Sequence, residues 1–310
     1  MKYYTKILLI LCCFFSSKLF AQTMTDGLMM AKQQFCLGAS YRSDFWKNYW
    51  ESDFKRENLN LGNVSLQELG IMGNYGIKNN LNVIFSLPYV WTKASAGTLQ
   101  GMNGLQDLSL AVKYRFYDKN ILSGKFSLIA VAGISSPTTN YVADYLPLAI
   151  GSQSKTASLR GIAYYRHQNG LFLTLQGGYI RRANITIDRY SYYTDRQYNT
   201  NEVFMPDVAH FTVQTGLYKP NWIAELTFEQ MNTLGGADIR KNDMPFPSTR
   251  MVASKLGAMF TYRIPKHRNL SIIASYNYTI SGRNVGQSNN FGLSVFYVLP
   301  LHKGECQLGQ

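Results

Sequence analysis

The stretch Asp107-Leu-Ser-Leu-Ala-Val-Lys-Tyr-Arg-Phe116 decides the fold, because its side chains alternate in character at every step. Successive side chains of a strand point to opposite faces of the sheet. One face would carry the large apolar residues Leu108, Leu110, Val112, Tyr114 and Phe116. The other would carry the polar or small residues Asp107, Ser109, Ala111, Lys113 and Arg115. The same alternation recurs over 222–228 and 291–299, so the chain is predicted to repeat strands with one apolar and one polar face.

Short polar turns divide the chain at regular intervals. Five of them end in Asn just before an apolar segment, at 78–80, 118–120, 167–169, 219–221 and 266–269. Longer polar segments alternate with them, at 50–62, 93–103, 136–153, 184–207, 234–249 and 281–288. This alternation is typical of outer-membrane barrels, whose periplasmic turns are short and whose extracellular loops are long.

About twelve strands fit between these connections. They are expected at 34–49, 63–76, 81–92, 104–117, 121–135, 154–166, 171–183, 208–218, 222–233, 250–263, 270–280 and 289–299. Most have nearly the length of about 9–11 residues that a tilted strand needs to cross a bilayer. We therefore predict an all-β fold over 34–300, in the form of a closed antiparallel transmembrane β-barrel.

A barrel surrounded by lipid accounts for these strands better than a soluble sandwich does. A sandwich would use shorter strands and bury one face of each sheet against the other. In hydrocarbon every backbone N–H and C=O must be bonded within the protein, and a barrel does this without sheet edges. Aromatic residues near the short turns are expected to form an interfacial girdle, and they are Tyr75, Phe116, Tyr165, Tyr218, Tyr262 and Tyr297. Simple alternation turns one of them, Tyr218, inward.

The first 21 residues have the order of a cleavable export signal. Basic residues precede the apolar run 7–15, and the small residue Ala21 ends the segment. We expect cleavage after Ala21 and export to the outer membrane of a Gram-negative bacterium. Residues 22–33 would then form an N-terminal periplasmic segment or a plug of the lumen, and residues 301–310 a periplasmic tail.

The charge pattern indicates which partners to expect. The formal net charge is +13 at pH 7, but the charges are scattered and form no basic stripe of the kind that binds nucleic acid. We expect no nucleic-acid partner, and instead outer-membrane lipid and lipopolysaccharide. The last strand resembles the C-terminal signal that the barrel assembly machinery recognises, through Asn290, Gly292, Val295 and Tyr297.

The polar faces of the strands would line the lumen of the barrel. The charged residues expected there are Asp107, Lys113, Arg115, Arg160, Glu225, Glu229, Lys255 and Arg263. Opposite charges in such a lumen would pair or line water. Asp107 could be a gating or binding carboxylate, but we favour it as the ion-pair partner of a lumen Lys or Arg.

Two cysteines remain once the signal is removed, Cys36 at the first strand and Cys306 in the tail. A closed barrel brings its first and last strands together, so the two can form a disulfide in the oxidising periplasm. Two free thiols are the alternative, and the sequence leaves both open.

No catalytic site is predicted, and the protein is expected not to be an enzyme. A lipid hydrolase, which is one alternative, would need a nucleophile within hydrogen-bond reach of a His. Only His210 falls on an expected strand, and no motif pairs it with a particular Ser. No metal or cofactor is expected, because neither ligand spacing nor a nucleotide-binding motif is present. The other alternative is a structural or adhesive barrel that binds a partner through its loops, above all the Tyr-rich segment 189–198.

Two segments carry a family resemblance. Residues 75–89, YGIKNNLNVIFSLPY, followed by residues 104–114, GLQDLSLAVKY, resemble the outer-membrane transporter family named for the meta-pathway of phenol degradation. That family usually has Gly directly before the Asp, where this chain has Gln106. The resemblance implies an outer-membrane channel or transporter for passive passage or binding of small, often hydrophobic molecules, and it does not imply that phenol is the substrate.

Pro88 has a further implication in a channel of this kind. Proline lacks a backbone N–H and therefore removes one donor from the strand ladder. The loosened pairing could open a lateral route between the lumen and the membrane. The alternative, which we favour from the sequence, is a strand end that tolerates proline beside its loop.

Overall fold

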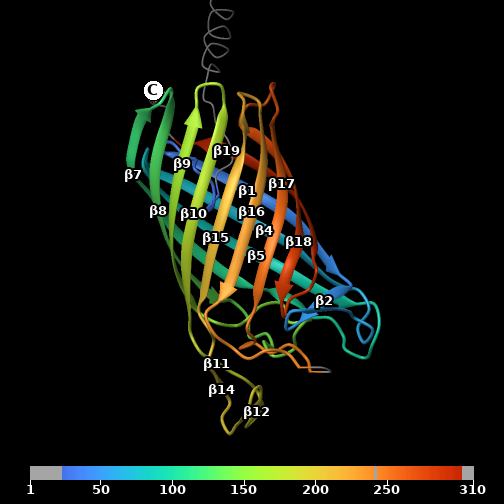
Figure 1. Cartoon of the computed structure of the whole chain (residues 1–310). Coiled ribbons are helices and arrows are strands. Elements are labelled where there is room, and N and C mark those ends of the chain that lie inside the picture. The colour runs from blue at the N-terminus through green and yellow to red at the C-terminus, as the bar shows by residue number, and fades with distance from the viewer. Residues whose placement is uncertain (1–22, 241–242, 302–310) are drawn as a thin grey trace, which may run out of the picture.

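The computed structural model describes residues 23–240 and 243–301 (Figure 1). The predicted signal peptide, residues 302–310 of the tail and Cys306 lie outside the described residues, and so does the expected disulfide. Over the described ranges, no helix has the length and apolarity to cross a membrane.

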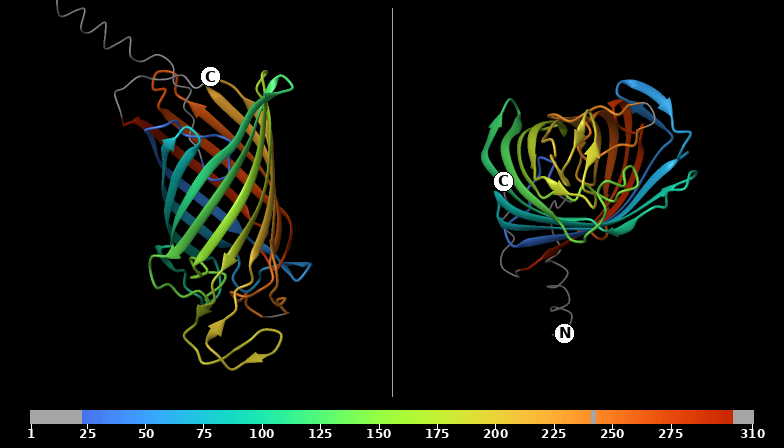
Figure 2. Two further views of the ribbon diagram at one scale, coloured as in Figure 1. Left: turned by 90° about the vertical axis from the view of Figure 1, so that its left-hand side faces the viewer. Right: turned by 90° about the horizontal axis from the view of Figure 1, so that it is seen from below.

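Twelve long strands form the wall of a closed barrel, as predicted (Figures 1 and 2). Their bounds are β1 (Gln34–Trp46), β4 (Val64–Lys78), β5 (Leu81–Ala94), β7 (Asp107–Ile121), β8 (Gly124–Pro137), β9 (Thr156–His167), β10 (Leu171–Arg182), β15 (Val208–Tyr218), β16 (Trp222–Thr233), β17 (Val252–Arg263), β18 (Leu270–Arg283) and β19 (Asn289–Pro300). Each pairs antiparallel with its neighbours in the chain. The first strand pairs with the last, from Gln34 opposite Pro300 to Phe45 opposite Asn289, and this pairing closes the barrel.

The remaining strands are short. A three-residue strand, β6 (Asn103–Leu105), continues the wall beside β5. The others form small hairpins in the long loops, and they are β2 (Asn48–Glu51), β3 (Phe54–Glu57), β11 (Ile185–Thr186), β12 (Tyr192–Tyr193), β13 (Gln197–Tyr198) and β14 (Glu202–Val203). All long loops lie at one end of the barrel, opposite the short turns (Figure 1).

The outer face of the wall is apolar, as the alternation predicted. The five apolar residues of β7 named above are 37–57% exposed, whereas Ala111 and Lys113 on the opposite face are 4% and 0% exposed. The same holds along β19, where Phe291, Leu293, Val295, Tyr297 and Leu299 all face outward. Large apolar side chains exposed all around a barrel are stable only against lipid, so this surface is the membrane belt.

Two sequence predictions at the strand ends are wrong. The turn expected at 118–120 lies instead at Leu122 and Ser123, which both have positive φ, 49° and 57°, as a two-residue hairpin turn requires. Asp118 stays in the ladder because its carboxylate accepts a hydrogen bond from Ser127 Oγ at 2.8 Å. The first strand ends at Trp46, and residues 48–51 turn away into the β2–β3 hairpin.

The aromatic girdle is incomplete at one position. Phe116, Tyr262 and Tyr297 are exposed on the lipid face near the short turns. Tyr218 instead packs inward against Tyr164, Phe172 and Ile223, which agrees with its position in the alternation.

The lipid face can be tested by a charge on the outer wall. In Leu226→Arg the guanidinium replaces a side chain that is 63% exposed to lipid on β16. The substitution should lower the free energy of unfolding in vesicles by about 2–4 kcal/mol, measured by urea titration. The control Leu59→Arg, in a loop outside the wall, should change it little. Equal losses in both variants would contradict the assignment of the outer face.

Candidate functional site in the barrel lumen

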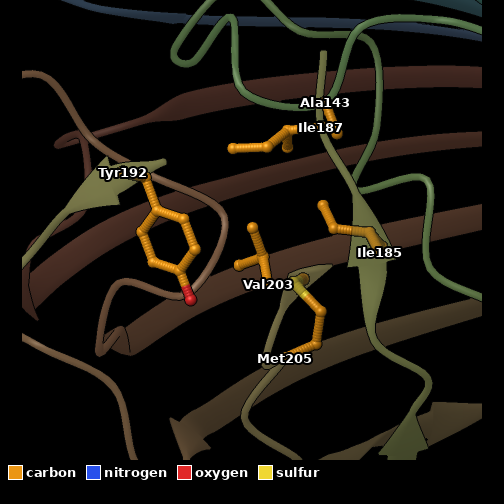
Figure 3. Packing of buried hydrophobic residues seen from close by; sticks show 6 residues of the cluster. All are labelled: Ala143, Ile185, Ile187, Tyr192, Val203 and Met205. Atoms are coloured by element: carbon orange, nitrogen blue, oxygen red, sulfur yellow. The ribbon is translucent and has the colours of Figure 1, made fainter. Parts of the chain in front are cut away.

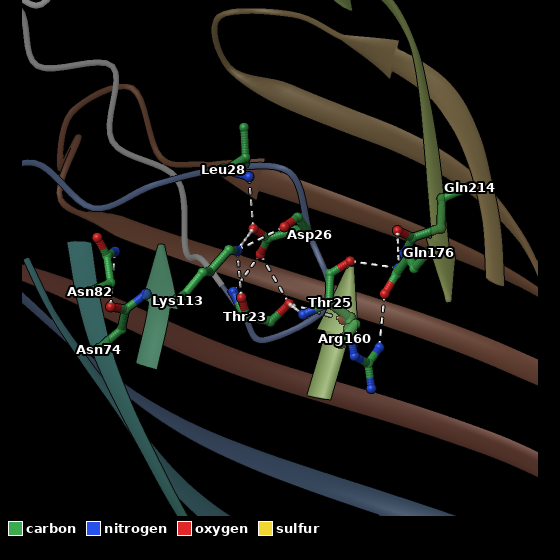
Figure 4. A network of polar contacts seen from close by, with 10 residues as sticks. All are labelled: Thr23, Thr25, Asp26, Leu28, Asn74, Asn82, Lys113, Arg160, Gln176 and Gln214. Carbon is green, nitrogen blue, oxygen red and sulfur yellow. Dashed lines mark hydrogen bonds and ion pairs between the residues drawn. The ribbon is translucent and has the colours of Figure 1, made fainter. Parts of the chain in front are cut away.

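Residues 23–33, called here the inner segment, lie inside the barrel (Figure 4). Near the short turns, Gln33 N donates to Gly76 O at 2.8 Å and Lys32 N to Asn79 Oδ1 at 2.9 Å. Deeper in, Met30 is fully buried in an apolar cluster with Cys36, Ile273, Phe296 and Val298. The segment is therefore held by the wall on several sides.

Lys113 of β7 holds the far end of the inner segment. Its Nζ donates to Thr23 O at 2.9 Å, to Asp26 O at 2.7 Å and to Asp26 Oδ1 at 2.9 Å (Figure 4). The Lys113 side chain is 0% exposed. A buried ammonium is tolerated only when its hydrogen bonds and its charge are compensated, so these three contacts fix the segment and the wall to each other.

A row of polar side chains crosses four neighbouring strands of the wall. Arg160 Nη1 on β9 donates to Gln176 Oε1 on β10 at 2.8 Å. Gln176 Nε2 donates to Thr25 O of the inner segment at 2.7 Å and to Gln214 Oε1 on β15 at 2.8 Å. Gln214 Nε2 donates to Glu225 Oε1 on β16 at 2.9 Å. The inner segment is thus bonded to this polar row as well as to Lys113 (Figure 4).

A cavity of about 500 Å³ lies between the inner segment and β9, β10 and β15 to β18. Near the short turns it is lined by Tyr164, Phe172, Tyr218 and Ile223, and the first two rings have their centroids 6.1 Å apart. Farther along the same strands the lining includes Arg160, His210 and Glu229. The lining is therefore apolar at one end and polar or charged along the rest, and a volume of this size suits a small organic molecule.

His210 lies on β15 opposite Gly178, and its imidazole occupies the space beside that glycine. A Cβ at Gly178 would come within 2.2 Å of the ring. Within the described part of the chain, neither ring nitrogen has a hydrogen-bond partner. His210 therefore forms no nucleophile–base pair with a serine among these residues.

Of the eight charged residues predicted to line the lumen, the structure brings only some together. Arg160, Glu225 and Glu229 line the cavity, and Lys113 contacts the inner segment. Lys255 lies opposite Glu229 in the pairing of β16 and β17.

The remaining three lie near the ends of the wall. Asp107 accepts a hydrogen bond from Tyr141 at 2.7 Å. Arg115 pairs with Asp118 at 3.4 Å. Arg263 is 3% exposed and donates to Pro220 O at 3.4 Å.

Several polar residues of this site were missed by sequence reasoning. Gln176 and Gln214 lie on inward-facing strand positions, so alternation could have found them, but they carry no charge that distinguishes them from other polar strand residues. Asp26 and Thr25 carry no local signal, because their partners are 87 and 151 residues away.

The long loops lie over the opposite mouth of the barrel. An apolar cluster joins three of them, and it consists of Ala143, Ile185, Ile187, Tyr192, Val203 and Met205, with Tyr198 and Phe246 packed against it (Figure 3). Arg189 Nε donates to Asp144 Oδ2 at 2.9 Å between two loops. A second contact joins the loop after β16 to the end of β18, where Arg283 Nε donates to Asp238 Oδ1 at 2.7 Å. This hydrogen bond lowers the pKa of the Asp238 carboxyl. Seen from this end, the loops lie across the opening (Figure 2).

The closed wall and its apolar belt define a transmembrane β-barrel of the outer-membrane kind. The family model described as "Putative MetA-pathway of phenol degradation" matches residues 59–295. The chain belongs to this family, which confirms the resemblance found in the sequence.

One solved structure shares the barrel architecture, and two others are more distantly similar. The COG4313 outer membrane channel from Pseudomonas putida F1 has a TM-score of 0.68 and 13% identity, over 91% of this chain and 100% of that one. The translocator domain of the autotransporter NalP from Neisseria meningitidis has a TM-score of 0.44 and 11% identity, over 87% and 88%. The CymD monoaromatic hydrocarbon channel has a TM-score of 0.38 and 10% identity, over 89% and 90%. No curated protein matches the sequence.

The contact between Lys113 and the inner segment can be tested by conductance. Lys113→Met removes three donors to the segment, so the segment should leave the lumen more often and the mean single-channel conductance in planar bilayers should rise. The control Arg115→Met, two residues along the same strand, removes contacts to Asp118 and Asn79 and leaves the inner segment's contacts with Lys113 in place. If the two variants conduct alike, Lys113 does not hold the lumen closed.

Proposed function

We propose that this protein is a passive outer-membrane channel for small, largely apolar molecules, closed at rest by its inner segment. The observation that carries the proposal is the cavity of about 500 Å³ between the inner segment and the wall, with aromatic and aliphatic side chains at one end. Lys113 and Gln176 hold the segment across the lumen, so passage requires the segment to move. The name of the COG4313 outer membrane channel, which has the same fold, supports a role in transport.

The protein is proposed to have no catalytic activity. A hydrolytic site needs a nucleophile activated by a base, and His210 has no such partner in the described chain. The purified parent protein should hydrolyse lipid no faster than a protein-free blank. The His210→Ala variant should give the same rate.

Export and assembly belong to the same proposal. Residues 1–21 are proposed to be a signal peptide, and the barrel assembly machinery is proposed to insert the chain. Lipopolysaccharide would then surround the belt, as in a Gram-negative outer membrane. The disulfide between Cys36 and Cys306 stays a prediction.

Uptake by intact cells tests the channel. Cells that produce the protein should take up radiolabelled naphthalene faster than cells without it, because lipopolysaccharide slows the direct entry of apolar solutes. Ser275→Trp would fill the cavity from β18 and should reduce this gain about fivefold. The matched control is Ala274→Trp, the neighbouring residue on the exposed face of the same strand.

Two outcomes would count against the proposal. An equal gain in both Trp variants would exclude the cavity from the path. No gain in the parent protein would exclude the channel, and adhesion of the same cells to a surface or partner would then favour the adhesive barrel.

A further inference from the structure

The charges of the chain are divided unequally between the two ends of the barrel. Five short turns join neighbouring wall strands at one end (Figure 1), and they are residues 79–80, 122–123, 168–170, 219–221 and 264–269. No acidic residue lies in these turns or within three residues of them. Eight basic residues do, and they are Lys78, Lys119, Lys125, Arg166, Lys219, Arg263, Lys266 and Arg268. We call these eight residues the short-turn rim.

The end with the long loops has no such excess. The six connections between wall strands at that end contain nine basic and ten acidic residues, and they are residues 47–63, 95–106, 138–155, 183–207, 234–251 and 284–288. Several of these charges pair with each other, such as Lys47 with Glu57 at 2.6 Å. Residues 23–301 contain ten more basic than acidic residues, so the eight residues of the short-turn rim account for most of the excess.

The short-turn rim has few acidic neighbours. The acid nearest to it in the sequence is Asp118, which pairs with Lys125 at 3.1 Å. Four other rim residues are exposed and form no ion pair within the described chain, and they are Lys78, Lys119, Lys266 and Arg268. Like charges gathered at one end of a protein repel one another and destabilise the compact state. Anions beside the rim would offset this repulsion.

The rim lies at the level of the lipid headgroups. Each of the five short turns has at least one rim residue in it or beside it. Phe116, Tyr262 and Tyr297 face outward near the same turns, and aromatic rings in this position favour the headgroup region. Lys119 Nζ lies 5.6 Å from the centre of the Tyr117 ring, so the cations and the rings share one layer.

A negatively charged lipid headgroup fits this arrangement. Basic residues beside a membrane attract anionic lipids over about one Debye length. Arg166, which lies 4.4 Å from the centre of the inward Tyr218 ring, and Arg263, which is 3% exposed, add to the positive field without facing lipid. The exposed cations are spread over several turns around the barrel, so many small headgroups can contact them at once. A single acidic protein would contact one side of the rim.

We propose that the exposed cations of the short-turn rim bind the anionic headgroups of phospholipids, such as phosphatidylglycerol, in the leaflet beside them. The loops at the other end carry nearly balanced charge, so the preference is confined to one leaflet. Bound headgroups offset the repulsion within the rim and hold this end of the barrel at a fixed depth in the membrane. The inference does not depend on what passes through the lumen.

Spin-labelled lipids in phosphatidylcholine vesicles that contain the purified barrel measure this preference. At low salt the parent protein should hold labelled phosphatidylglycerol about twofold more tightly than labelled phosphatidylcholine. The preference should disappear in about 1 M salt, where the Debye length is about 3 Å.

Two variants of equal net charge locate the preference on the barrel. The rim variant combines four exchanges of exposed cations and should lose most of the preference, and these are Lys78→Gln, Lys119→Gln, Lys266→Gln and Arg268→Gln. The loop variant removes four exposed cations from the long loops and should keep the preference, and its exchanges are Lys55→Gln, Lys155→Gln, Arg196→Gln and Arg250→Gln. Heat-dependent gel mobility shows that each variant is folded.

Three results would overturn the proposal. A parent protein that holds both labels equally has no anionic lipid site. Equal losses in the two variants would mean that net charge, and not the rim, sets the preference. An unchanged preference in the rim variant would exclude lipid as the partner of these cations and would favour an acidic protein instead.

Discussion

The structure depends on one constraint, that backbone N–H and C=O groups in hydrocarbon must be bonded within the protein. The pairing of β1 with β19 meets it by removing the sheet edges. Because the wall is closed, the outward side chains within the belt can be apolar, and most polar side chains of the strands are turned inward. The alternation seen in residues 107–116 is the local form of this constraint.

The same constraint explains why the inner segment lies in the lumen. Inward polar groups need partners, and the ammonium of Lys113 and the amide of Gln176 find them on the inner segment. The segment therefore completes the polar interior, and its position follows from the chemistry of the wall. The loop 138–155 makes comparable contacts with the wall, because the hydroxyls of Thr138 and Thr139 donate to the backbone oxygens of Gln106 and Leu105. In both places polar side chains donate to backbone oxygens across the contact.

Much of the fold could be predicted from the sequence, because strand alternation is a local signal. The twelve strands and the outward face of β7 follow from it. Turns were less certain, because Asn120 resembles a turn residue and only the pairing with β8 shows that it continues the strand. The site was less predictable still. Lys113 could be assigned to the lumen, but its partner Asp26 is 87 residues away, and nothing near Tyr141 in the sequence indicates Asp107.

Hydrogen exchange in lipid nanodiscs tests the central claim, closure of the wall, most directly. If β1 and β19 are paired along their length, their amides should exchange as slowly as those of β10, which has a neighbour on each side. Fast exchange along β1 and β19, with slow exchange elsewhere, would reveal two free edges and contradict the closed barrel.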